Sequence, residues 1–430
     1  MSRGKRILII VICVLTASSG LFAIISGIIA NAKGDTRSAT STTVIAKVGK
    51  EKIRYNEFYE LLDYYMQSWY GVGADSLDQY FGVEYGNSIR ESVIDELIEK
   101  KVALQNIKEY GLDKLSDEDE KEIKALMDSY LDDLSETIKQ SIITDYTDED
   151  GIFLLSDEEF ANELKLQTEQ FREASGYTDE YLFNYYREYY LINKMYEKVT
   201  EDNLPTAEEV KEKYDALLEE QIKSAEDDPE NAMMYYDYGY NDINVFVPQD
   251  IKYVKQILIQ FSDEELEELS GIEDEAEEEK RLNELHAKLR PKALSIYNEL
   301  INGGDFDTLI EKYSDDEYKN EEPYASEGYG VYENSGYVDS FEEESLKLTE
   351  IGQMSPLFES EYGFHIVKLV SIKQKGPIPL EELSDELIEL VKGEKQEAAW
   401  EEKISLWKEG MTIKKYEDRY LAEETSEDKG

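Results

Sequence analysis

The chain has 430 residues, with 98 acidic against 46 basic side chains and a formal net charge of -52. Because the phosphate backbone is itself negative, so large an acidic excess argues against a nucleic-acid-binding protein. The single cysteine, Cys13, excludes an intrachain disulfide and a cysteine-ligated zinc cluster. The length suggests two or three domains, and a hydrophobic fraction of 41% is enough to build their cores.

The first residues are basic and then apolar. Three basic residues stand among the first six, and residues 7–30 carry no charge. A helix of that length crosses a hydrocarbon core of about 30 Å, and basic residues before it favour a cytoplasmic N-terminus. We therefore expect residues 1–32 to be a signal or membrane anchor, which places a single-pass protein in the cell membrane with most of the chain extracytoplasmic. Ala30 and Ala32 also fit a cleavage site, and cleavage after Ala32 would make the protein secreted.

After a polar linker at residues 33–43, the chain shows mainly helical periodicity up to about residue 220. The pattern Ser/Thr-x-x-Glu, which caps the starts of helices, begins at Ser88, Ser156 and Thr206. We expect residues 44–250 to form a helical domain.

The helical period returns near the C-terminus, in residues 375–420. An amphipathic helix cannot bury its apolar face alone, so we expect this one to pack on the N-terminal helices. Short alternating runs at residues 43–54 and 411–414 predict a hairpin and a further strand. The polar residues 421–430 predict a disordered tail.

Two alternating runs, residues 253–260 and 363–372, enclose the middle of the chain and predict β-strands. Between them lie the pattern G-x-F-x-x-L-x-x-x-Y-S-x-D, ending at Asp316, and the pattern F-x-x-x-S-L-x-L, beginning at Phe341, with G-x-x-S behind it. The second strand opens with the sequence Tyr-Gly-Phe-His-Ile-Val-Lys-Leu. This order and spacing resemble the parvulin-type peptidyl-prolyl isomerases. The resemblance implies a four-stranded, mostly antiparallel sheet with helices over residues 251–374.

Two other stretches, residues 44–58 and residues 205–214, resemble the extracytoplasmic foldases of the PrsA and SurA types. In those proteins the N- and C-terminal segments form one helical chaperone domain, and the isomerase domain is an insertion. The resemblance therefore implies an α+β fold. A parvulin-like domain would be inserted in an all-helical SurA-N/trigger-factor-like chaperone domain built from residues 44–250 and 375–420.

The same resemblance implies four catalytic candidates. His365 falls on the second core histidine of the family, and Asp316 falls where its members place a cysteine or aspartate facing the substrate carbonyl. Ser360 is a candidate hydroxyl partner. A neutral structural histidine and a helix-end carboxylate are the alternative interpretations of His365 and Asp316. The main departure is Gln256, because the family usually carries histidine there; glutamine can donate and accept a hydrogen bond but cannot titrate.

Tyr337 and Phe341 fall on positions that line the proline pocket of the family, with Leu346 beneath it. Packing in the core is the alternative for all three residues. Prolyl isomerisation has a barrier of about 18–20 kcal/mol and requires no covalent step. A pocket whose polar groups stabilise the twisted peptide better than the planar one is therefore sufficient, and we expect no cofactor.

Residues 263–284 are strongly acidic and predict a loop longer than the minimal fold needs, which would repel a phosphorylated substrate. His286 follows without a metal-like companion, and we expect it to be exposed on a helix. Asp148, Asp150 and Asp157 approach the spacing of a calcium loop, but the first and last ligand positions do not fit. We therefore expect no specific metal site.

Two functions follow from these observations. The first is a membrane-anchored foldase that acts as a peptidyl-prolyl isomerase and chaperone for exported, unfolded or proline-containing polypeptides. The alternative is a non-catalytic holdase chaperone with a degenerate parvulin domain, which Gln256 would explain. A surface scaffold is a third function, although no motif specifically requires it. The expected partners are unfolded polypeptides and the membrane, not nucleic acid, and a homodimer is left open.

Overall fold

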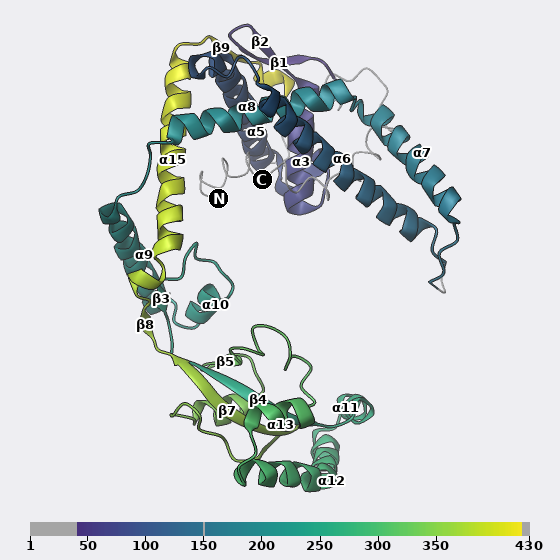
Figure 1. Cartoon of the computed structure of the whole chain (residues 1–430), viewed down its shortest axis with the longest axis vertical. Helices are drawn as coiled ribbons and strands as arrows, with labels where there is room; N and C mark the ends of the chain where they lie inside the picture. Colours follow the sequence, from purple (N-terminus) through teal and green to yellow (C-terminus); the bar gives the residue numbers. More distant parts are fainter. Residues whose placement is uncertain (1–40, 149–150, 424–430) are drawn as a thin grey trace. The chain divides into compact units, whose positions relative to one another are not determined.

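The computed structural model describes residues 41–148 and 151–423 (Figure 1). The chain divides into two compact units. The first unit contains the chain up to Pro205 and again from Lys392, and the second unit is Thr206–Val391.

Several expected segments fall outside the described residues, namely the anchor at residues 1–32, most of the linker and residues 424–430. No helix within the described part of the chain combines the length and the apolar character that a bilayer crossing requires. Residues 421–423 of the expected disordered tail belong to the described part of the chain. Ala422 exchanges two hydrogen bonds with the side chain of Asn87, at 2.9 and 3.0 Å, so its backbone is held in place.

Helices make up most of the first unit. They are α3 (Tyr55–Tyr70), α4 (Leu77–Phe81), α5 (Val83–Asn106), α6 (Asp117–Asp145), α7 (Asp157–Ser175), α8 (Asp179–Thr200) and most of α15 (Ser384–Glu409). The expectation of an all-helical domain is nevertheless wrong, because β1 (Val44–Val48) pairs antiparallel with both β2 (Glu51–Arg54) and β9 (Ile413–Lys415). The two short alternating runs, which lie far apart in the sequence, meet in this small sheet.

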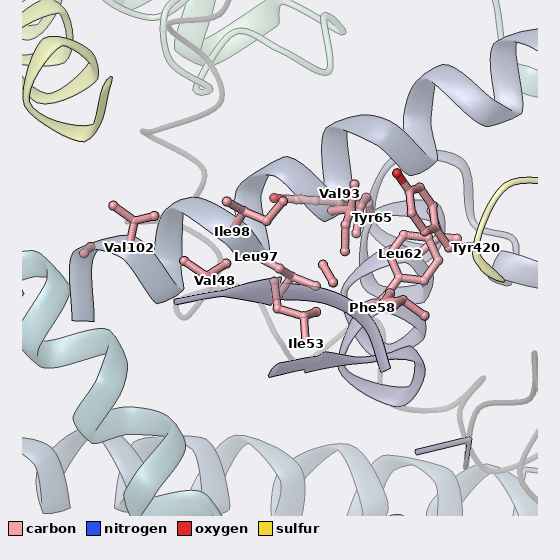
Figure 2. Close-up of a cluster of buried hydrophobic side chains, with 14 of the residues drawn as sticks. Val48, Ile53, Phe58, Leu62, Tyr65, Val93, Leu97, Ile98, Val102 and Tyr420 are labelled. Atoms are coloured by element: carbon pink, nitrogen blue, oxygen red, sulfur yellow. The ribbon is translucent and has the colours of Figure 1, made fainter. Parts of the chain in front are cut away.

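A hydrophobic core connects the two ends of the chain within the first unit, and Figure 2 shows part of it. Ile53 of β2, Phe58 of α3 and Ile98 of α5 are almost completely buried there. Ile404 of α15 belongs to the same core. The ring of Tyr420 lies 5.8 Å from the ring of Phe58. The C-terminal helix therefore buries its apolar face against helices from the other end of the chain, which removes that face from water.

The second unit is built on a four-stranded antiparallel sheet, in the order β5-β4-β7-β6. Its strands are β4 (Ile251–Gln260), β5 (Tyr329–Val331), β6 (Phe358–Ser360) and β7 (Gly363–Lys373). Its helices are α9 (Ala207–Asp227), α10 (Ala232–Asp237), α11 (Asp263–Ser270), α12 (Glu275–Ile301), α13 (Phe306–Tyr313) and α14 (Asp339–Leu346). A separate pair is formed by β3 (Phe246–Val247) and β8 (Gly376–Pro377). The predicted four-stranded sheet is thus confirmed.

The two faces of this sheet carry different helices. Ile257 and Phe364 point to the face that α12 and α13 cover. Val254 and Val367 point to the opposite face, where α14 packs. Because side chains alternate along a strand, successive residues of β4 and β7 point to opposite faces and pack in one or the other of these two layers.

Two of the three expected capping boxes start helices. Ser156 and Thr206 each accept a hydrogen bond from the backbone N–H three residues later, at the starts of α7 and α9. The prediction at Ser88 is wrong, because α5 already begins at Val83, after Gly82 in a left-handed conformation. Ser88 instead donates to a backbone carbonyl inside the helix.

Two segments of the second unit differ from expectation, one in the unit to which it belongs and one in its conformation. Residues 206–250, expected in the chaperone domain, fall in this unit, and Val210 of α9 packs in one cluster with Val245. Residues 263–284, expected to be a loop, form α11 and the first turns of α12. Ser262 caps α11 by accepting a hydrogen bond from a backbone N–H of its first turn. The acidic residues in the first turns of α11 and α12 lie where the helix dipole favours negative charge.

The contribution of α15 to the first core can be tested with two substitutions on the same helix. Ile404 is 3% exposed and Leu406 is 55% exposed. We expect Ile404→Ala to lower the free energy of unfolding by about 2–5 kcal/mol, because it leaves a cavity in the core. Leu406→Ala should change it by no more than about 0.5 kcal/mol. Urea unfolding followed by tryptophan fluorescence measures both, and equal effects of the two substitutions would contradict the packing.

Candidate functional site

Strands β4 and β7 carry Gln256 and His365 to the same face of the sheet. Gln256 is opposite Val367 and His365 is opposite Leu258, so the two polar residues are diagonal neighbours across the antiparallel pair. The ring of His365 lies 5.9 Å from the ring of Phe341. Gln256 and His365 therefore lie in the layer between the sheet and α14.

The four predicted catalytic candidates form one row of hydrogen bonds. Gln256 Nε2 donates to Asp316 Oδ2 over 2.9 Å, and Gln256 Oε1 lies 3.0 Å from His365 Nδ1. Ser360 Oγ lies 2.6 Å from His365 Nε2. A carboxylate only accepts, so the nitrogen of the Gln256 amide must face Asp316 and its oxygen must accept from His365 Nδ1–H. His365 Nε2 is then left as the acceptor for the hydroxyl of Ser360.

His365 is held as a neutral imidazole. Burial lowers the pKa of His365 to about 4, since a charged ring would lose its hydration. The ring of Phe358 stacks on it at 5.3 Å, with only 13° between the two planes. The structural and the functional interpretations of His365 therefore describe the same arrangement, a neutral ring with one tautomer between two polar partners.

Asp316 is buried, and three donors surround its carboxylate. Besides Gln256, the hydroxyl of Tyr329 lies 2.8 Å from both carboxylate oxygens, and the backbone N–H of Tyr318 donates to Oδ1 over 3.1 Å. Burial, together with the hydrogen bond to Asp316, raises the pKa of Tyr329 far above its usual value, so the phenol stays protonated. These three donors are held in place by the fold, so they keep the carboxylate in one orientation.

The segment that carries Asp316 is fastened to the sheet. Ser314 Oγ accepts from the backbone N–H of Leu258 over 3.0 Å, and the N–H of Asp315 donates to the carbonyl of Leu258 over 2.8 Å. Asp316 stands three residues after the last residue of α13, and its carboxylate bonds the sheet residue Gln256 instead of capping the helix end.

Tyr329 was missed from the sequence. It follows Gly328, whose φ is +88° and where a Cβ atom would stand only 2.6 Å from the carbonyl oxygen of Val254. Only glycine permits that approach of the two backbones, which sets Tyr329 opposite Val254 on β4. The signal that could have found it is the run Gly-Tyr-Gly between two predicted strands. Phe358, which stacks on the site histidine, was missed as well.

The three predicted pocket residues adjoin this row. The ring of Tyr337 lies 5.4 Å from the ring of Phe341 and 5.9 Å from the ring of Tyr329. Phe341 is buried, and Tyr337 and Leu346 are half-buried members of the same cluster. Burial raises the pKa of Tyr337 to about 12, so its phenol is neutral. An uncharged, largely aromatic surface therefore stands beside the row of polar groups.

His286 is not exposed, contrary to expectation. It is 6% exposed, and its ring lies 5.3 Å from the ring of Phe364 in β7. The acidic segment before it forms the first turns of α12, and the helical turn that carries His286 faces the sheet. Its Nε2 lies 2.9 Å from the backbone carbonyl oxygen of Ser360.

The structure gives no support to a metal centre in the part that it describes. No group of three histidine, cysteine, aspartate or glutamate side chains among the described residues could hold a metal ion. Asp150 of the calcium-like motif lies outside those residues, so the motif itself is not described.

Comparison with known families matches both parts of the chain. A PPIC-type PPIase domain, or rotamase, matches residues 259–371, and a SurA-like N-terminal domain matches residues 2–153.

Curated relatives agree with these matches. The foldase protein PrsA of Clostridium perfringens strain 13 is 30% identical over 132 residues, which are 30% of this chain and only 38% of that protein. The foldase protein PrsA of Clostridium botulinum strain Hall is 24% identical over 403 residues, which are 90% of this chain and 92% of that protein.

Solved structures were found for similar proteins, at low similarity. PrsA from Bacillus subtilis has 16% identity and a TM-score of 0.20, and covers 86% of this chain and 92% of that one. A SurA-like chaperone from Campylobacter jejuni has 17% identity and a TM-score of 0.27, and covers 61% of this chain and 88% of that one. TM-scores this low do not establish a structural relationship. The chain therefore has a PPIC-type parvulin domain together with a SurA-like N-terminal domain, and it is a relative of the PrsA foldases.

Proposed function

We propose that the protein is an extracytoplasmic foldase, held in the cell membrane by residues 1–32, that isomerises prolyl bonds and binds unfolded exported polypeptides. The observation that carries the enzymatic part is the row from Asp316 to Ser360, which stands beside the half-buried ring of Tyr337. The strongly acidic chain also suits clients with basic segments, since a net charge of -52 attracts positively charged groups.

In this proposal the rings of Tyr337 and Phe341 hold the substrate proline, and Asp316 faces the carbonyl oxygen before it. A planar amide carries partial negative charge on that oxygen, and twisting the bond removes the charge because resonance is lost. A fixed carboxylate therefore destabilises the planar form more than the twisted form, which lowers the barrier. Gln256 and His365 contribute by holding Asp316 in place, and no covalent bond forms or breaks.

Replacing the carboxylate with its uncharged isostere tests the enzymatic part. We expect Asp316→Asn to lower kcat/KM for a proline-containing peptide about ten- to hundredfold, which is typical for the loss of one electrostatic group in a preorganised site. Asp339→Asn, at an exposed position of α14, is the matched control and should leave the rate unchanged. A peptide assay on the full-length chain that shows no rate above the uncatalysed one would remove the isomerase from the proposal.

A specific surface of the first unit favours the alternative, a holdase chaperone. Trp69, Tyr80 and Tyr85 are 44%, 59% and 56% exposed. The ring of Phe81 lies 5.7 Å from that of Tyr80 and 5.4 Å from that of Tyr85. Trp69 joins them through Tyr70, whose ring lies 6.5 Å from that of Trp69 and 4.8 Å from that of Phe81. We call these residues, with Tyr70, the aromatic surface of α3–α5. A contiguous exposed aromatic surface is typical of a site for another polypeptide.

The aromatic surface can be removed without touching the parvulin domain. We expect the triple change Trp69→Ser, Tyr80→Ser and Tyr85→Ser to raise about tenfold the concentration needed to suppress aggregation of a denatured client, because each ring contributes about 0.5–1.5 kcal/mol. Tyr238→Ser with Tyr240→Ser, at exposed positions of the second unit, is the matched control. If the triple variant suppresses aggregation as well as the unchanged chain does, this surface is not the client site.

A further inference from the structure

The chain contains only two histidines, and both contact the same residue. His365 meets the hydroxyl of Ser360, with 2.6 Å between Nε2 and Oγ. His286 meets the backbone carbonyl of Ser360, with 2.9 Å between Nε2 and the oxygen. The two histidines approach Ser360 from different elements, α12 and β7, so one residue of β6 connects them.

The environment of His286 fixes its orientation. Its ring packs between the rings of Phe261, at 5.2 Å, and Phe364, at 5.3 Å. The carboxylate of Glu359 lies 3.9 Å from Nδ1, which is too long for a hydrogen bond, and Arg290, one turn later on α12, forms an ion pair with that carboxylate. A carbonyl oxygen only accepts, so Nε2 of His286 carries a hydrogen in both protonation states of the ring.

The backbone of Ser360 needs such a support, because Ser360 ends β6 and begins a tight turn into β7. Ser360 pairs with Gly363 of β7. Gly363 has no room for a side chain, because a Cβ atom there would stand 2.2 Å from the carbonyl oxygen of Ile259. The hydroxyl of Ser360 also accepts from the backbone N–H of Tyr362 over 3.0 Å. Its own hydrogen is therefore directed to His365, provided that the backbone of Ser360 keeps its place.

We propose that His286 is a positioning residue of the candidate site. Its Nε2–H holds the Ser360 carbonyl, which aims the Ser360 hydroxyl at Nε2 of His365. With Nε2 occupied as an acceptor, His365 carries its hydrogen on Nδ1, which is the tautomer that Gln256 Oε1 accepts. His286 thus acts through Ser360 on the far end of the row that holds Asp316. Its effect on catalysis rests on the proposed isomerase function, whereas its effect on His365 does not.

Because no other histidine is present, labelling the full-length chain with ¹⁵N-histidine gives signals from these two rings alone. We expect His365 to show a single Nδ1–H tautomer in the unchanged chain. In His286→Leu, which removes the donor at similar volume, the Nε2 signal of His365 should move toward that of a ring nitrogen that accepts no hydrogen bond, whereas Nδ1 keeps the hydrogen that Gln256 Oε1 accepts. Unchanged nitrogen shifts of His365 in a folded His286→Leu chain would overturn the proposal.

Two further variants keep the test decisive if His286→Leu does not fold. The amide nitrogen of His286→Gln can reach the position of Nε2, whereas the shorter side chain of His286→Asn cannot. We expect glutamine to preserve the Nε2 signal of His365 and asparagine to shift it. Equal spectra for the two variants would overturn the proposal.

The kinetic readout separates positioning from a general loss of structure. We expect His286→Asn to lower kcat about three- to tenfold with KM unchanged, because Tyr337 and Phe341 are untouched, and His286→Gln to recover most of the loss. A change in KM alone would contradict a positioning role. If the unchanged chain shows no isomerase activity, the proposed function fails, and the Nε2 signal of His365 still decides whether His286 positions Ser360.

Discussion

The amide of Gln256 sets the direction of every hydrogen bond around it. Its nitrogen can only donate, and the carboxylate of Asp316 can only accept, so the amide has one orientation in the row. Its oxygen then requires a hydrogen on Nδ1 of His365, which leaves Nε2 for Ser360. A histidine at position 256 would have a choice of tautomers and could be charged. Glutamine removes that choice, and the row becomes neutral except for one carboxylate.

Parts of the second unit that are distant in the sequence converge on this row. Ser314 and Asp315 fasten the Asp316 segment to β4, and Gly328 lets Tyr329 approach the same strand. His286 supports β6 from α12. The precision of the row therefore depends on the packing of α12, α13 and β5 around the sheet, and not on the four residues alone. A buried polar network of this kind stabilises one arrangement only when all its members are satisfied.

Much of this geometry could be predicted from the sequence, for identifiable reasons. Alternation along the sequence predicts the two strands that carry Gln256 and His365, and the resemblance to the parvulins implies that these two residues and Asp316 share one site. Residues whose position depends on how one helix or strand is rotated relative to another could not be predicted in this way. His286 became buried because the acidic segment before it forms a helix, and only the rotation of that helix decides which side faces the sheet. Ser88 was misjudged because a glycine six residues earlier allowed the helix to start sooner.

The geometry of the row depends on His365 being a neutral ring with one tautomer, held between an amide oxygen and a hydroxyl. A ¹⁵N nuclear magnetic resonance titration of this histidine in the unchanged protein tests it directly. We expect a pKa of about 4 for His365 and a hydrogen on Nδ1 throughout the neutral range. A pKa near the ordinary value of about 6.5, with both tautomers populated, would contradict it.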